Sequence, residues 1–129
     1  MVAATTNIYE AFLNAQREMP DLQKTGINPH FRNRYVPLEE LIAKVVPVLN
    51  KHGLMITQPP EGHSVITRLE HISGEWREGV MPMNIEHANM QSYGIEATYR
   101  RRYSYCMVLG IVTEEDTDGA GGKARKTGV

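Results

Sequence analysis

Three consecutive arginines, Arg100 to Arg102, stand in a segment that is otherwise apolar enough to be core, TYRRRYSYCMVLGIV. Successive residues of a helix are about 100° apart, so three in a row fan over roughly 200°. Tyr105 and Leu109 indicate that one face of this helix is buried. The arginines therefore cannot all lie on its far side. We expect at least one of them to flank the core, next to a partner, a phosphate or a neighbouring subunit.

Length and composition restrict the class of protein. The 129 residues correspond to one domain, and 41% hydrophobic with 22% charged residues is typical of a soluble globular chain. The single Cys106 excludes an internal disulfide framework and a cysteine-based zinc site. There is no apolar run of about 18 residues and no signal-peptide pattern. We therefore expect a cytoplasmic protein with no membrane contact.

Hydrophobic periodicity predicts three helices. The first spans 7–19, with Asn7 as its cap and Pro20 as its stop. The second begins at Pro37, follows a 3.6-residue period and stops at Gly53; Pro47 is expected to kink it. The third begins between residues 89 and 92 and runs to about Gly110.

Strands are predicted between the second and third helices, at 54–58, 64–72 and 76–83, and the segment 22–36 is expected to be a loop. The last two strands form a hairpin whose turn requires Gly74 to adopt a positive φ, and Trp76 is expected to pack. The order helix, helix, three strands, helix predicts an α+β fold. We assign residues 1–112 to the domain and 113–129 to an acidic, then Gly/Lys-rich tail that is partly disordered.

Charge is distributed unevenly. The windows 22–38 and 97–113 contain none of the 15 acidic residues, but six of the 14 Lys and Arg and five of the nine aromatic residues. Basic side chains interleaved with aromatic rings suit single-stranded nucleic acid, because cations follow the phosphates while rings stack on bases. The alternative, that the rings are core and the arginines lie on a solvated face, remains open.

No motif indicates catalysis. The chain lacks a phosphate-binding loop and a nucleophile elbow, and its five histidines show no ligand spacing. The segment EEDTDG places Glu114, Asp116, Asp118 and Gly119 at calcium-loop offsets, but Arg125 stands where a bidentate Glu is required. We therefore expect no enzyme activity and no cofactor, with weak Mg²⁺ binding by the acidic cluster left open.

Three blocks of the sequence resemble the ERF (essential recombination function) family of bacteriophage single-strand annealing proteins. They are NPHFRNRYVPLEELIAKVVPVLNKHGLMITQ, TRLEHISGEW and QSYGIEATYRRRYSYCMVLGIVTEEDTDG, in the family's order. Arg101 and Arg102 match the family's arginine pair, whereas Arg100 stands where the family usually has Ala. The family usually carries a longer C-terminal region, and this chain ends soon after Gly119.

The resemblance implies a β-β-β-α core and a protein that binds single-stranded DNA, forms homo-oligomeric rings or filaments and anneals complementary strands in recombination without ATP. It implies a phage or prophage protein acting in the cytoplasm of a bacterial host, with host recombination or single-strand-binding proteins as further partners. The expected phosphate-binding residues are Arg101, Arg102, Arg100, Arg32, Arg34 and Lys24. The candidates for base stacking, each also a candidate for the core, are Phe31, Tyr35 and Tyr99.

Two rival functions remain open at this stage. One is a plain single-stranded DNA-binding protein that protects strands without annealing them. The other is a protein-interaction module with no DNA role, whose arginines pair with the acidic cluster of a neighbour.

Overall fold

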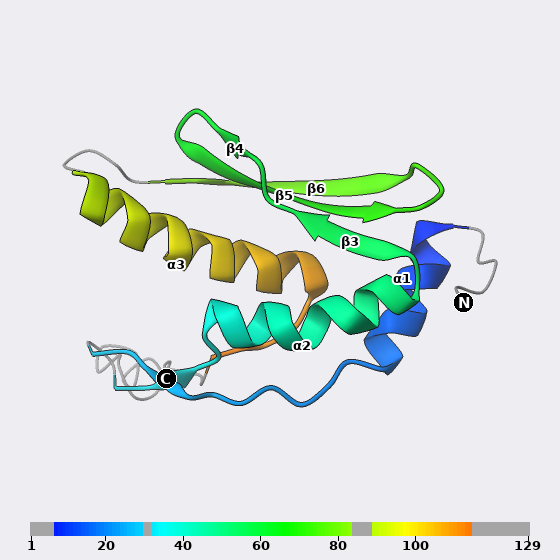
Figure 1. Cartoon of the computed structure of the whole chain (residues 1–129), viewed down its shortest axis with the longest axis horizontal. Coiled ribbons are helices and arrows are strands. Elements are labelled where there is room, and N and C mark those ends of the chain that lie inside the picture. The colour runs from blue at the N-terminus through cyan, green and yellow to red at the C-terminus, as the bar shows by residue number, and fades with distance from the viewer. Residues whose placement is uncertain (1–6, 30–31, 84–88, 115–129) are drawn as a thin grey trace, which may run out of the picture.

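The helices lie on one side of an antiparallel sheet. The computed structural model describes residues 7–29, 32–83 and 89–114. Its elements are, in order, α1 (Ile8–Arg17), β1 (Gly26–Ile27), β2 (Arg34–Tyr35), α2 (Leu38–Lys51), β3 (Leu54–Thr57), β4 (Pro60–Glu61), β5 (Ser64–His71), β6 (Trp76–Pro82) and α3 (Met90–Leu109). In Figure 1 α3 lies along one face of the sheet, α2 lies against α3, and α1 lies at the end where the β5–β6 turn is found.

The core forms between this sheet face and the helices. Along β5, residues with odd numbers are buried and those with even numbers are half-buried, which is the alternation of a strand with one covered face. The core residues come from every helix, from β3 and β5, and from Val36 just before α2. They are Ile8, Ala11, Ala15, Val36, Leu41, Val45, Leu49, Leu54, Leu69, Tyr105, Cys106 and Leu109. The predicted α+β class and the predicted order of the main elements are therefore confirmed.

Two predicted helices begin at residues whose side chains cap them. The Asn7 side chain accepts a hydrogen bond from the Glu10 backbone N–H at 2.8 Å, and Asn89 does the same for Ser92 at 2.8 Å. These side chains satisfy backbone donors that have no partner within the helix. The helix α2 continues through Pro47 to Lys51. No helix among the described residues is long and apolar enough to cross a membrane.

The sheet is built around β5. The strand β6 pairs with it along one edge, whereas β3 and β4 share its other edge. The predicted strand at 54–58 is observed as β3, which ends at Thr57, but pairing on this edge of β5 extends further than predicted. Pairing resumes at Pro60, which lies opposite Val65. This pair has the same register as the pairs of β3 with β5, which start at Leu54 and His71. The strands β3 and β4 are therefore one strand that is interrupted at residues 58–59.

Two further expectations need correction. Residues 22–36 are not entirely loop, because β1 pairs with β2 over two residues each, too short a ladder to produce a visible period. Trp76 is not part of the core, because 49% of its surface is exposed and the Arg68 guanidinium stacks over its ring at 4.2 Å. It lies on the sheet face that no helix covers, where a cation–π contact replaces burial.

The turn between β5 and β6 is attached to α1. Glu75 accepts hydrogen bonds from the Ile8 backbone N–H at 3.0 Å and from the Ser73 hydroxyl at 2.9 Å. A carboxylate at a helix N-terminus satisfies an unpaired donor and interacts favourably with the helix dipole. Gly74 has φ +96°, which confirms the predicted conformation of the turn. The hairpin tip is thus part of the scaffold.

Replacing Gly74 with Ala is expected to lower the free energy of unfolding by about 1 kcal/mol, because a side chain strains a residue with positive φ. The cost is conformational, since a Cβ at this position meets no atom within 4 Å. Gly94 is the matched control: it lies in α3, its added Cβ also meets nothing within 4 Å, and Ala there is expected to stabilise. Urea unfolding measures the stability of both variants. Equal stability of Gly74→Ala and Gly94→Ala would contradict the conclusion that the turn requires a positive φ at Gly74.

Candidate nucleic-acid interface

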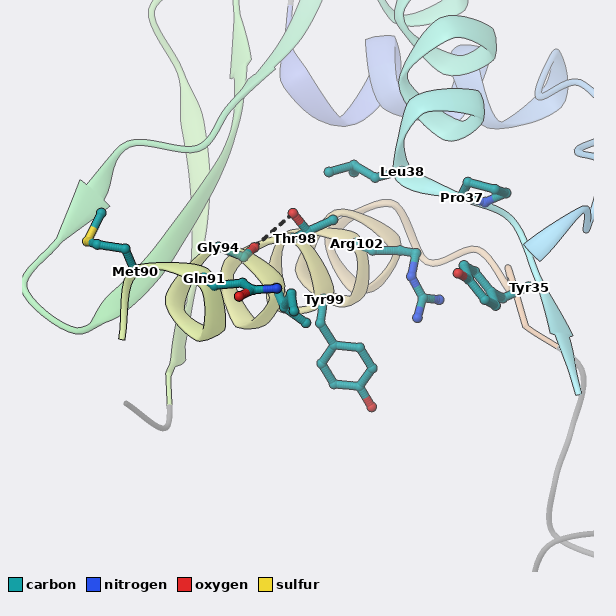
Figure 2. A pocket seen from close by; sticks show the side chains of 10 residues that line it. Tyr35, Pro37, Leu38, Met90, Gln91, Gly94, Thr98, Tyr99 and Arg102 are labelled. Atoms are coloured by element: carbon teal, nitrogen blue, oxygen red, sulfur yellow. Dashed lines mark hydrogen bonds between the residues drawn. The ribbon is translucent and has the colours of Figure 1, made fainter. Parts of the chain in front are cut away.

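An open groove lies between the first half of α3, the start of α2 and β2. Its volume is about 590 Å³, and Figure 2 shows the residues that line it. They are Tyr35, Pro37, Leu38, Met90, Gln91, Gly94, Ile95, Thr98, Tyr99 and Arg102. The lining is mainly apolar and aromatic, with one cation in its wall.

The α3 side of this groove exposes large apolar side chains to solvent. Met90 is 84% exposed, Ile95 66% and Tyr99 40%, and the Tyr99 ring extends away from the helix in Figure 2. Exposed apolar and aromatic side chains of this kind can stack on unpaired bases. Such stacking does not depend on the base sequence, because every base has an apolar face. Of the three predicted stacking residues, Tyr99 is the one that the structure leaves most accessible along this groove; Phe31 lies outside the described residues.

Arg102 forms the wall of the groove and is buried. Its Nη1 donates to Glu114 Oε1 at 3.0 Å, and its guanidinium lies 4.2 Å from the centre of the Tyr35 ring and 5.0 Å from that of Tyr103. The side chain is 7% exposed. The expectation that one arginine flanks the core is therefore met by Arg102, and its partner is a carboxylate of its own chain.

Glu114 connects three segments of the chain. It also accepts a hydrogen bond from the Asn33 side-chain amide at 3.1 Å, and its backbone forms a β-bridge with Tyr35. Burial tends to raise the pKa of Glu114, but the hydrogen bonds from Arg102, Asn33 and Tyr103 outweigh it and lower the pKa below its usual value. Residues 115–129, which include the rest of the predicted acidic cluster, lie outside the described residues.

Tyr35 is held in place by a glycine opposite it. Gly26 pairs with Tyr35 in the β1–β2 ladder, and a Cβ on Gly26 would lie 2.4 Å from Cζ of the tyrosine ring. The ring therefore lies directly against the backbone of Gly26 while it also contacts Arg102. Tyr35 is half-buried in this position, so its observed contacts are those of a structural residue that borders the groove.

The other two arginines of the triplet have different surroundings. The Arg100 Nε donates to Glu96 Oε2 at 2.7 Å, one helical turn away, and Arg100 lies roughly 200° around α3 from Arg102 and hence away from the groove. The Arg101 Nε donates to the side-chain oxygen of Gln58 at 3.1 Å. Arg101 follows the groove residue Thr98 by three positions, so the two are neighbours on the surface of α3, although Arg101 does not itself line the groove.

The remaining predicted cations are dispersed. All three are exposed: Lys24, Arg32 and Arg34. Arg34 belongs to β2, where successive side chains point to opposite faces. Its side chain therefore points away from the groove that the next residue, Tyr35, borders. Arg32 has φ +59°, the one non-glycine residue with positive φ in the part of the chain that the structure describes. The structure therefore brings Tyr35, Tyr99 and Arg102 together in the lining of the groove. Arg101 contacts Gln58, the Arg100 guanidinium lies 5.7 Å from the centre of the Tyr99 ring, and Lys24, Arg32 and Arg34 do not line the groove.

Several residues of this site carry no sequence signal for binding. The apolar groove residues Met90 and Ile95 were not predicted, although their apolar side chains at solvent-facing helix positions are a weak signal. Gln58 could have been noticed because it stands between a strand and two prolines. No group of three His, Cys, Asp or Glu that could hold a metal ion is found in the described ranges.

Replacing Glu114 with Gln is expected to lower the free energy of unfolding at pH 7 by about 1.5–3 kcal/mol, because the Arg102 guanidinium loses a charged acceptor. The folded-state pKa of Glu114 is lowered, so its contribution is present above the pKa of an unfolded glutamate and is lost as pH falls through the folded value. The difference in unfolding free energy between the wild type and Glu114→Gln, measured by urea unfolding, should therefore shrink below about pH 4. A difference that is independent of pH would refute this role.

Comparison with known protein families identifies the family of the whole chain. The model of the ERF superfamily matches residues 8–127, nearly the whole chain. Searches of curated proteins and of solved structures give no significant match. The match includes β2, α2 and all of α3, the elements whose residues line the groove or lie directly beside it. The chain belongs to the ERF superfamily.

Proposed function

We propose that this protein binds single-stranded DNA along the groove of α3 and anneals complementary strands in recombination without ATP. The observation that carries the proposal is a groove lined with exposed apolar and aromatic side chains along α3, the helix that carries the three arginines. Membership of the ERF superfamily supports the same role.

The proposed mechanism separates phosphate contacts from base contacts. The guanidinium of Arg101 contacts phosphates, which are alike for every sequence. Tyr99 and the apolar residues of the groove contact the faces of the bases. A strand held in this way is bound without regard to sequence, and the incoming strand supplies the free energy by base pairing. No covalent bond is made or broken, so neither a catalytic residue nor a nucleotide or metal cofactor is part of the proposal.

The structure suggests different roles for the three arginines. Arg102 is committed to Glu114 and Tyr35, so its proposed role is to shape the groove wall that faces the DNA. Arg100 is paired with Glu96 on the far side of the helix. Arg101 is therefore the first choice for the phosphate contact, with Lys24, Arg32 and Arg34 as more distant contacts along a longer strand.

Annealing of a long strand requires more surface than one domain offers, and we propose a homo-oligomer, in the form of a ring or filament. The strand β6 pairs only with β5 among the described elements, which leaves its outer edge for a second chain. An apolar hollow beside that edge is lined by Gly79, Val80, Met81, Ser104, Met107 and Val108. Host recombination proteins are further candidate partners.

Replacing Arg101 with Ala is expected to weaken binding to poly-dT and to make the slope of log K against log salt shallower by about 0.7 for each subunit contact. Arg100→Ala is the matched control in the same helix, since its charge is paired with Glu96 and lies away from the groove. A salt titration of both variants measures this. Unchanged affinity and slope for Arg101→Ala would refute the phosphate contact.

Annealing itself is tested with complementary oligonucleotides. A protein that binds single strands but does not accelerate their pairing would be a plain single-strand-binding protein. Absence of binding to any oligonucleotide would instead favour a protein-interaction module.

The oligomer is tested by light scattering at micromolar concentration, where we expect a mass well above that of a dimer. Met107→Lys should lower this mass, because Met107 is 68% exposed beside the free edge of β6. Ile72→Lys is the control, since Ile72 is equally exposed at 72% but lies in the turn after β5. A monomer with and without DNA would count decisively against annealing by an oligomer.

A further inference from the structure

We infer that Gln58 is a positioning residue, which holds the guanidinium of Arg101 toward a DNA phosphate and leaves its charge unneutralised. The inference rests on the proposed function, because it concerns how the same phosphate contact is prepared. In this inference Gln58, a neutral residue of the sheet, contributes to DNA binding through Arg101 without contacting the DNA itself.

Gln58 stands at the interruption between β3 and β4. The pairs Thr57–Arg68 and Pro60–Val65 belong to one register, which would place Gln58 opposite Thr67. Backbone pairing is missing there, and Pro59 has no N–H to donate to the ladder. The Gln58 side chain crosses to β5 in its place and donates to the Thr67 hydroxyl at 3.0 Å. The irregularity in the strand therefore places an amide between the sheet and α3.

The amide is fixed in one orientation. Its nitrogen donates to the Thr67 hydroxyl and to the backbone carbonyl of Arg101, at 3.0 and 3.1 Å, and its oxygen accepts from Arg101 Nε at 3.1 Å. A flipped amide would set its NH₂ group against the Arg101 N–H and its oxygen against a carbonyl. Gln58 thus holds both the main chain and the side chain of Arg101.

The anchor beneath this amide is buried. The Thr67 hydroxyl also lies 2.6 Å from that of Ser104, and both residues are less than 5% exposed. Buried partners restrict the rotamer of Gln58, and Gln58 in turn restricts that of Arg101. A site of this kind loses less conformational entropy when the ligand binds, since the side chain is ordered beforehand.

Charge distinguishes Arg101 from its neighbours. Arg100 is paired with Glu96 and Arg102 with Glu114. Among the described residues Arg101 has no carboxylate partner, and its partner is the neutral amide of Gln58. Because Gln58 uses only Nε, the two terminal nitrogens of Arg101 keep their donors for a phosphate, which guanidinium groups bind through two parallel hydrogen bonds. A glutamate in place of Gln58 would remove this positive charge from the surface.

The test is a salt titration of poly-dT binding by the full chain with Gln58→Met and Gln58→Glu. Gln58→Met keeps the charge of Arg101 but releases its side chain, so we expect affinity to fall about three- to tenfold with the salt slope kept. Gln58→Glu pairs with Arg101, so we expect weaker binding and a slope shallower by about 0.7 per subunit contact, as for Arg101→Ala.

Two controls separate positioning from a general effect on folding. Thr57→Val removes the hydrogen bond from the Thr57 hydroxyl to Glu70, one residue before Gln58, and leaves the contacts of Gln58 with Thr67 and Arg101 in place. It should therefore lower stability and keep DNA affinity and slope. Gln58→Met should also have no further effect on affinity in an Arg101→Ala protein, because Gln58 acts through Arg101.

Three results would overturn the inference: unchanged binding by both Gln58 variants, an equal loss in the Arg101→Ala background, or an equal loss of affinity with Thr57→Val. If Gln58→Met does not fold, the salt slope of DNA binding by Gln58→Glu tests the inference instead. If Arg101→Ala itself binds like the wild type, the proposed phosphate contact fails instead, which is a different outcome from failure of the positioning role.

Discussion

The ion pair between Arg102 and Glu114 holds together the part of the molecule that the candidate site depends on. Its two members come from the middle of α3 and from the segment that follows the helix. Asn33 and Tyr35 add the segment before α2, through a hydrogen bond to Glu114 and a cation–π contact with Arg102. The carboxylate of this pair has a second hydrogen-bond donor in Asn33, and the guanidinium also lies over the Tyr35 ring. Such additional partners offset part of the desolvation cost of the pair. The groove exists because these three segments meet.

The different surroundings of the three consecutive arginines follow from this arrangement. A buried cation needs a counter-charge, and Glu114 supplies one for Arg102. Arg101 is half-buried rather than buried, and its partner is a neutral amide. Consecutive residues of one helix are thus directed to different surroundings, one into the domain and one toward its surface. The same rotation of about 100° per residue that forces one arginine against the core frees the next for a ligand.

The sheet contributes through its irregularities as well as its regular pairing. Its covered face supplies the core, whereas the interruption at residues 58–59 supplies the amide that contacts α3. The uncovered face carries Trp76 against Arg68 and a salt bridge between Arg68 and Glu78 at 2.8 Å. A face with paired charges is a poor surface for a polyanion, which further favours the α3 side for DNA.

The sequence by itself determined the elements that depend on local pattern. The 3.6-residue period predicts α2, the side chains of Asn7 and Asn89 start their helices, and a glycine at positive φ turns the hairpin, because each depends on neighbours a few residues away. Only the tertiary structure decided which arginine is buried, since Arg102 is selected by its contacts with Tyr35 and Glu114. It alone revealed Gln58 too, whose partners Thr67 and Arg101 lie 9 and 43 positions away. Contacts of that separation leave no period in a sequence, and they formed the site.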